Sequence, residues 1–186
     1  MPRREVLQRM QVTRNARVVN PLKPEWGPGI VLAVDGTRAT AFFLRGGKRI
    51  LDTTIPTLIP LLKYEGKHPA LELAGQVDWD NAHENLYVIE LRSEVFNERK
   101  FLEANRGDVP GVRPCVYVGM TGLTPEDRLK AHLSGTHSAR FVRKYGLRLL
   151  PDLYKHFNPM PYVLAQRMEV ELASQLRAEG YGVWQN

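Results

Sequence analysis

The chain has 186 residues, 43% of them hydrophobic and 25% charged, as expected for a globular protein of one large or two small domains. Its single cysteine excludes an internal disulfide and favours a reducing compartment. No apolar stretch approaches the roughly 18 residues of a membrane span, and the N-terminus lacks the apolar core of a signal peptide, so we expect a cytoplasmic protein.

The net charge of +6 is unevenly distributed along the chain. Residues 1–65 hold 11 Lys and Arg against 5 Asp and Glu, whereas residues 66–186 hold 15 of each. Within that neutral remainder, positions 128–155 hold seven basic residues and one acid. Two basic zones fit a polyanionic partner such as DNA, but a general surplus that favours solubility explains the total equally well.

Residues 1–15 are polar and basic, and we expect a short helix or a loose arm there. From 16 to 63, short apolar runs alternate with turn signals, among which Asp35-Gly36 is a strong two-residue hairpin signal. Four or five short strands at this spacing predict a small β-barrel of SH3-like size. The residues expected to close its core are Leu58, Ile59, Leu61 and Leu62.

The predicted barrel opens on Pro24-Glu-Trp-Gly-Pro-Gly-Ile-Val31 and ends on Phe43-Leu-Arg-Gly-Gly-Lys-Arg-Ile-Leu51. These two sequences resemble the small barrels at the ends of some bacterial helicases and in RNA-polymerase-binding proteins of the CarD type. The resemblance implies a module that docks on protein or nucleic acid, without catalysis. We expect Trp26 to pack in the core or against a turn, and Lys48 and Arg49 to lie on a solvated loop or to contact nucleic acid.

Residues 64–84 become polar and mixed in composition, which indicates a linker with one helical turn near residues 70–74. Trp79 is expected to pin this linker to a domain. A second domain begins near Asn85. The predicted organisation is an arm over 1–15, a barrel over 16–63, a linker over 64–84 and a domain over 85–186, with an α+β fold class.

Two strands are predicted early in the second domain, Leu86–Leu91 with alternating character and Cys115–Gly119 with a continuous apolar run. The residues between them, 92–113, are charged and contain Gly and Pro, so we expect a polar connection. The later elements expected are a helix over 138–146 with a Ser cap and a Gly stop, a strand over 147–150, and a helix over 161–179 that stops at Gly180.

A further helix is predicted after the second strand. Thr124 is a good N-cap, Pro125 suits the first helical position and Gly135 is a plausible stop. Arg128 and His132 are four residues apart and share one helix face. The neighbouring face, which holds Leu129 and Leu133, is expected to pack on the sheet.

The long C-terminal helix places a carboxylate among apolar residues. With Leu172 as the reference, Glu169 falls about 60° away, inside the apolar stripe, and Glu171 falls about 100° away, at its edge. A carboxylate that faces a packed interior needs a cation or strong hydrogen bonds. A metal ion or Arg128 could supply the cation, and a structural ion pair is the plainer alternative.

The order of these residues defines a motif set. Leu86-Tyr87 lies in the first strand, Tyr117-Val118-Gly119 in the second, Arg128 and His132 on the next helix, and Ala165-x-x-x-Glu169 on a later helix. Residues 85–186 thereby resemble a GIY-YIG nuclease domain, a small antiparallel or mixed sheet flanked by helices. Leu86 replaces a Gly of the family motif, and 30 residues separate the two tyrosines where the family has a short hairpin. This insertion either carries DNA contacts or merely extends the loop.

The resemblance implies an endonuclease that hydrolyses DNA phosphodiester bonds with one divalent ion, Mg²⁺ or Mn²⁺, held largely by Glu169 and waters. Arg128 would contact the scissile phosphate. A tyrosine would act as general base, its pKa lowered by nearby cations. We favour Tyr87 as that base, with Tyr117 positioning the water, although their roles could be reversed. The other implied site residues are His132, which would assist proton transfer or touch phosphate, and Asn186.

Further basic residues are expected to contact DNA, namely Lys130, Arg140, Arg143, Lys144, Lys48 and Arg49. The alternative function is a catalytically silent, DNA-binding adaptor associated with RNA polymerase or a helicase. The missing motif Gly and the long insertion leave the adaptor open, whereas the intact set of Tyr, Arg and Glu favours the enzyme.

Overall fold

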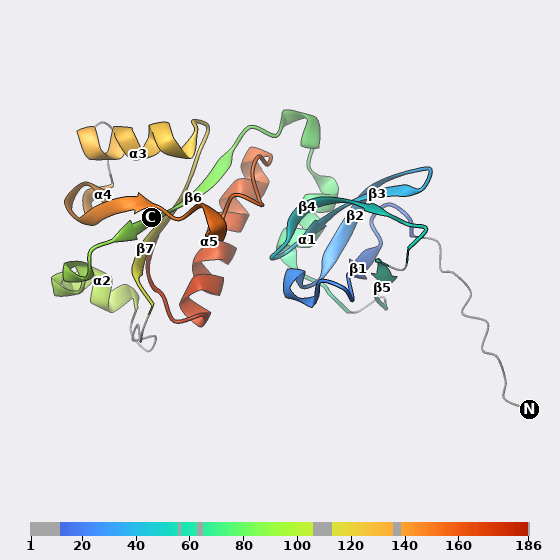
Figure 1. Cartoon of the computed structure of the whole chain (residues 1–186), viewed down its shortest axis with the longest axis horizontal. Coiled ribbons are helices and arrows are strands. Elements are labelled where there is room, and N and C mark those ends of the chain that lie inside the picture. Colours follow the sequence, from blue (N-terminus) through green and yellow to red (C-terminus); the bar gives the residue numbers. More distant parts are fainter. Residues whose placement is uncertain (1–11, 56, 63–64, 106–112, 136–138, 186) are drawn as a thin grey trace, which may run out of the picture. The chain divides into compact units, whose positions relative to one another are not determined.

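In a computed structural model the chain forms two compact units, residues 1–76 and 77–186, each with its own sheet (Figure 1). The structure describes residues 12–55, 57–62, 65–105, 113–135 and 139–185. Most of the predicted arm therefore lies outside the described residues. Both units combine helices with a sheet, so the α+β class is confirmed. None of the described helices is long and apolar enough to cross a membrane.

The first unit is built on a five-stranded antiparallel sheet of order β4-β3-β2-β1-β5. Its elements are β1 (Arg17–Val19), η1 (Pro24–Trp26), β2 (Gly29–Asp35), β3 (Arg38–Phe43), β4 (Gly47–Asp52), β5 (Ile59–Pro60) and α1 (Pro69–Gln76). Asp35 pairs with Arg38, which leaves Gly36 and Thr37 in a two-residue turn. Gly36 has a φ of 54°, which glycine adopts without strain. The predicted hairpin is confirmed.

The core of this unit differs from the prediction. Val31, Ala41 and Phe43 are fully buried, and they pack with Leu58. Ile59 and Leu62, also expected in the core, are 47% and 71% exposed. Ile59 lies on β5, a two-residue strand at the sheet edge, and Leu62 lies beyond that strand. Within the described residues β4 and β5 are the two edges and do not pair, so no closed barrel is seen.

Part of the predicted linker is a helix of the first unit. The eight-residue α1 is longer than the single turn expected, and Ala70, Leu71 and Ala74 are fully buried on it. An ion pair joins Glu72 to Arg17 of β1. The segment therefore contributes apolar surface to the first unit as well as leading to the second.

The second unit is built on a four-stranded mixed sheet of order β8-β6-β7-β9. Its strands are β6 (Asn85–Leu91), β7 (Cys115–Thr121), β8 (Gly146–Leu149) and β9 (Gly182–Gln185), and β9 runs parallel to β7. Its helices are η2 (Trp79–Asn81), η3 (Ser93–Asn97), α2 (Arg99–Ala104), α3 (Pro125–Ser134), α4 (Arg140–Tyr145), η4 (Pro151–Leu153) and α5 (Tyr162–Ala178). The strands and helices predicted here are confirmed, whereas β9 was not anticipated.

The insertion between the two tyrosine strands is not the polar connection predicted. Its described residues form η3 and α2, and Val95 and Phe101 are fully buried. The Asn105 amide accepts a hydrogen bond from the Val183 backbone N–H (2.8 Å) and donates one to the Val183 carbonyl (3.1 Å). The insertion therefore contributes to the core and pairs with the free edge of β9.

Helix α3 begins and ends as predicted, but a different face packs on the sheet. The Thr124 hydroxyl accepts a hydrogen bond from the Asp127 N–H, and Gly135 ends the helix with φ 90°. His132 is fully buried, whereas Leu133 is 50% exposed, so the prediction that the leucine face packs inward is wrong. A buried histidine is tolerated because both of its ring nitrogens have partners. Helix α4 has Ala139 at its N-cap, and the predicted Ser138 cap lies outside the described residues.

Candidate active site

The two tyrosines come together because of the register of β6 and β7. Tyr87 pairs directly with Gly119, so it shares one face of the sheet with Tyr117, two residues away on β7. The two phenol rings stack with their centroids 5.9 Å apart, and both side chains are buried. A Cβ at Gly119 would lie 2.6 Å from the Tyr87 hydroxyl and 2.8 Å from the Tyr117 ring. The glycine therefore provides the space in which the two phenols meet.

Replacing Gly119 with Ala should disturb the tyrosine pair. Overpacking a well-packed core typically costs about 1–3 kcal/mol, and we expect that loss in the free energy of unfolding measured in urea. Gly122→Ala is the matched control, because a Cβ there would lie no closer than 3.4 Å to any neighbour, the Glu84 carboxylate. Equal stability of the two variants would contradict the close packing inferred at Gly119.

His132 connects α3 to this pair, and its hydrogen bonds define its tautomer. The Ala139 backbone N–H can only donate, so His132 Nδ1, 3.0 Å away, must accept. Burial lowers the pKa of His132 to about 4, so the ring is neutral at pH 7 and its one proton is on Nε2. Nε2 lies 2.9 Å from the Tyr87 hydroxyl and therefore donates to it. Of the two roles considered for His132, direct contact with phosphate is disfavoured, since both nitrogens are used.

Arg128 lies one helical turn before His132 and acts on the same side chain, Tyr87. Burial raises the pKa of Tyr87, and hydrogen bonding and charge from Arg128 oppose that rise. Hydrogen bonding from Tyr117 also opposes the rise at Tyr87, and burial raises the pKa of Tyr117 well above its usual range. The prediction that cations lower the pKa of the catalytic tyrosine is wrong as a net direction, because loss of hydration outweighs them. The Tyr87 oxygen accepts from His132 Nε2, and hydrogen bonding from Arg128 and Tyr117 favours its phenolate.

Glu169 of α5 lies close enough for its negative charge to raise the pKa of both tyrosines. Its carboxylate is half-buried, and burial raises its own pKa to about 7. Among the described residues, no hydrogen bond or ion pair to this carboxylate is found. Arg128, one of the two cations considered as its partner, does not pair with it. Asn186, the last residue of the predicted set, lies outside the described residues.

Glu171, two residues further along α5, is in a different environment. It forms an ion pair with Arg167 at 2.6 Å, one turn earlier on the same helix. Its side chain is 16% exposed, which is more buried than a position at the edge of the apolar stripe suggests. The two glutamates thus differ chiefly in pairing, because Glu171 has a cation beside it.

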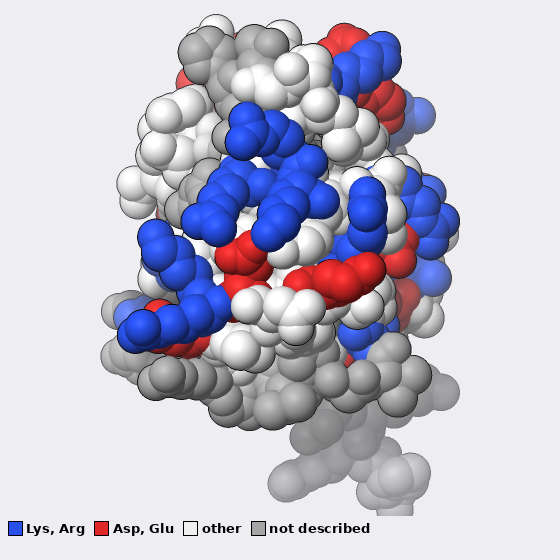
Figure 2. Space-filling model, turned by 90° about the vertical axis from the view of Figure 1, so that its left-hand side faces the viewer, with Lys and Arg blue, Asp and Glu red and all other residues white. Residues whose placement is uncertain are grey.

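Several of the predicted DNA contacts are engaged within the protein. Lys and Arg side chains gather on the side shown in Figure 2, with acids among them. Arg140 and Lys144 both pair with Glu98, at 3.1 and 2.8 Å, and Lys130 pairs with Asp127. Exposed pairs of this kind can exchange partners at little cost. Arg143 is exposed on α4, and no acid partner for it is found among the described residues.

The remaining two predicted contacts lie in the first unit. Lys48 and Arg49 belong to strand β4, not to the solvated loop that we predicted as one alternative. The Arg49 guanidinium lies over the Trp26 ring, 5.1 Å from its centroid, and Trp26 also contacts Phe43. Trp26 is therefore a packing aromatic, as expected, and Arg49 covers it.

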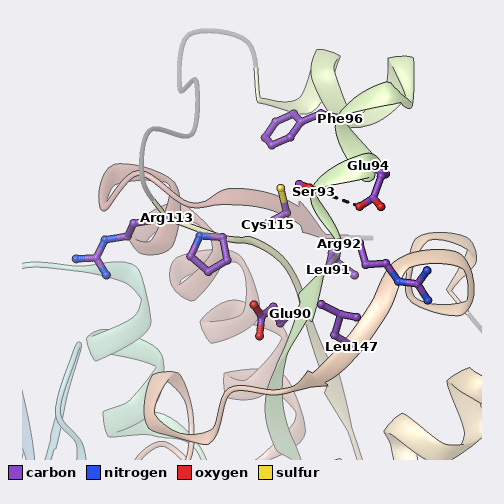
Figure 3. Close-up of a pocket in the computed structure, with 10 residues that line it drawn as sticks. Glu90, Leu91, Arg92, Ser93, Glu94, Phe96, Arg113, Cys115 and Leu147 are labelled. Atoms are coloured by element: carbon purple, nitrogen blue, oxygen red, sulfur yellow. Dashed lines mark hydrogen bonds between the residues drawn. The ribbon is translucent and has the colours of Figure 1, made fainter.

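A cavity of about 480 Å³ lies at the other end of β6 and β7 (Figure 3). Its lining comes from the ends of the two strands, η3 and β8, namely Glu90, Leu91, Arg92, Ser93, Glu94, Phe96, Arg113, Pro114, Cys115 and Leu147. Leu91 pairs with Cys115 four residues beyond the pairing of Tyr87 with Gly119, or about 13 Å along the strands. Burial raises the pKa of the Cys115 thiol to about 11, so it is an inert core residue, as predicted. The cavity is thus separate from the tyrosine cluster.

A protein family of unknown function, DUF3553, matches residues 15–61. The match covers the sheet of the first unit, which is well under half of the chain, and it does not reach the second unit. No curated protein and no solved structure matches the chain significantly. The tyrosine cluster lies outside the matched residues.

Proposed function

We propose that the second unit is a GIY-YIG-like, metal-dependent endonuclease that hydrolyses DNA phosphodiester bonds. The observation that carries the proposal is the meeting of five side chains from four elements. They are Tyr87 on β6, Tyr117 on β7, Arg128 and His132 on α3, and Glu169 on α5. Phosphodiester hydrolysis needs a base for the attacking water, a charge clamp for the phosphate and help for the leaving oxygen, and these side chain types supply the first two.

In this proposal the Tyr87 oxygen takes a proton from the water that attacks phosphorus. His132 donates to that oxygen from a fixed, buried position and stays neutral, so it stabilises the phenolate without exchanging its own proton. Tyr117 supplies a second donor. Arg128 is half-buried on α3, and its guanidinium would contact a phosphate oxygen.

Glu169 is the residue that would hold the divalent cation. A half-buried carboxylate with a raised pKa and no cation partner found in the described part of the chain fits that role. No group of three or more His, Cys, Asp or Glu able to hold a metal occurs among the described residues. A site with one carboxylate and several waters suits Mg²⁺, with Mn²⁺ as a substitute. When bound, the cation would supply charge that stabilises the leaving oxygen.

The cleavage assay tests this proposal directly. Purified protein is incubated with nicked, flapped, branched and linear DNAs in Mg²⁺ or Mn²⁺, with EDTA as the matched control. We expect cleavage of at least one substrate that stops with EDTA. The alternative, a catalytically silent adaptor associated with DNA and with RNA polymerase or a helicase, is favoured by the raised pKa values of both tyrosines. Binding without cleavage across all substrates and both metals would establish the adaptor.

We further propose that the first unit is an SH3-like docking module that contributes affinity rather than chemistry. Its five short antiparallel strands and the partly buried Trp26, which packs on Phe43, support this role, as do the basic residues Lys48 and Arg49 on an edge strand. RNA polymerase or a helicase would be its protein partner, and DNA is the other candidate.

Removing the first unit tests whether it binds DNA. If it does, a 77–186 fragment should bind DNA more weakly than the whole chain, and with a smaller dependence on salt, because fewer phosphates are neutralised. Binding is measured by fluorescence anisotropy at several salt concentrations, with circular dichroism of the fragment as the folding control. Equal affinity would assign the unit to protein docking.

A further inference from the structure

The outer edge of β6, away from β7, changes partner along its length. In an antiparallel strand, the backbone groups of alternate residues point to the same side. At one end, Glu90 pairs with Arg148 of β8, and the Val88 carbonyl accepts from the Leu150 N–H. At the other end, Glu84 exchanges two backbone hydrogen bonds with Met160 at 3.0 and 2.9 Å. Leu86 lies between these two groups, and no backbone among the described residues pairs with it on that side.

The Asn158 side chain lies beside Leu86, where a neighbouring strand would otherwise pair. The Leu86 N–H donates to Asn158 Oδ1 at 2.8 Å, and Asn158 Nδ2 donates to the Leu86 carbonyl at 2.8 Å. The amide thereby reproduces both hydrogen bonds of a neighbouring strand. Leu86 immediately precedes Tyr87. The Tyr87 hydroxyl lies 2.9 Å from its donor, Nε2 of His132 on α3. A shift of about 1 Å in a reacting group can cost a hundredfold in rate.

We propose that Asn158 is a positioning residue for the Tyr87 hydroxyl. It holds the backbone at Leu86 and so keeps Tyr87 aligned with His132 and Tyr117. Among the described residues, the Asn158 side chain hydrogen-bonds to Leu86 and to neither phenol, and in the proposed reaction it does not touch the substrate. This inference rests on the proposed function for its effect on catalysis, but the alignment of Tyr87 with His132 can be measured without it.

Asn158→Ala removes both hydrogen bonds, and Asn158→Asp keeps the acceptor but loses the donor. Asn97→Ala is the matched control, because Asn97 is exposed on η3. We expect kcat to fall about tenfold to a hundredfold in the alanine variant, with a smaller loss in the aspartate variant. The Kd for DNA should be unchanged in both, because Arg128 and the basic surface remain. Two results would overturn the proposal. One is an unchanged kcat in a folded alanine variant, and the other is a Kd for DNA that rises by the same factor as kcat falls.

The second measurement is NMR of protein labelled with ¹⁵N-histidine. The Nε2 proton of His132, buried and bonded to Tyr87, should give a slowly exchanging signal, assigned by its absence in Tyr87→Phe. We expect Asn158→Ala to weaken or lose this signal and Asn97→Ala to retain it. If the signal is unchanged, Asn158 does not position Tyr87, whatever the kinetics show. If the wild type cuts no DNA, the endonuclease proposal fails, and this signal alone decides the role of Asn158. Should the alanine variant not fold, the aspartate variant decides both measurements.

Discussion

Replacing Glu169 with Gln is expected to abolish DNA cleavage while leaving DNA binding nearly unchanged. Glutamine keeps the size and hydrogen bonding of the side chain but removes the charge that would hold the cation. Loss of preorganised charge stabilisation typically lowers the rate by about 10²–10³. Single-turnover cleavage in Mg²⁺ and anisotropy titration with the same DNA measure the two effects separately.

Glu171→Gln is the control for this substitution. This substitution also removes one negative charge, but from a carboxylate already paired with Arg167. The Glu171→Gln variant should therefore cleave DNA at the normal rate. Mn²⁺ titration adds a readout independent of cleavage. Burial raises the pKa of Glu169 to about 7, so protons should compete with the metal and weaken its binding as pH falls below 7. Equal loss of cleavage in both variants would show that the metal does not depend on Glu169 in particular.

The elements around the site could be predicted because local signals agree there. The apolar strand, the cap at Thr124 and the stop at Gly135 each specify one structure, and all three are confirmed, although β7 continues two residues beyond the predicted end at Gly119. The order of the motif residues also anticipated which side chains meet. The spacing of Arg128 and His132 predicted a shared face but not its direction, because hydrophobicity favoured the leucines as the buried residues.

Other features depend on contacts that a local pattern does not contain. The charges, Gly and Pro of residues 92–113 predict a polar connection, yet Val95 and Phe101 within it are fully buried. Ile59 is predicted in the core because it is apolar, yet it is 47% exposed on the two-residue edge strand β5. Asn158 precedes a proline and so reads only as a turn signal. Its pairing with Leu86, 72 residues away, has no signature in the sequence.

The direction of the Tyr87 pKa shift also depends on contacts that a local sequence pattern does not contain. A nearby arginine favours the phenolate, and that effect could be expected from residue types alone. The opposing cost depends on how completely the fold removes water, and Tyr87 is only 1% exposed. Burial therefore decides the direction of the Tyr87 pKa shift, and the donors around its oxygen only reduce the rise.

Tyr87→Phe should lower the cleavage rate by about 10²–10⁴, the usual contribution of a general base. Tyr117→Phe should cost less, since it removes one donor to the Tyr87 oxygen and leaves the base in place. Wild-type activity should rise with pH through the alkaline range, because burial raises the pKa of Tyr87. That rise should be lost from any residual activity of Tyr87→Phe. Single-turnover rates across pH provide the measurement.

Stability must be separated from chemistry in this pair of variants. Tyr87→Phe leaves the buried His132 Nε2–H without its acceptor, which typically costs about 1–3 kcal/mol. A domain with about 5–15 kcal/mol of stability stays folded after such a loss, so an inactive but folded variant has lost its base. Urea denaturation of both phenylalanine variants checks this. If Tyr117→Phe proved inactive while Tyr87→Phe kept its rate and its pH dependence, Tyr117 would be the base, and the donors at Tyr87 would serve only to hold the two phenols together.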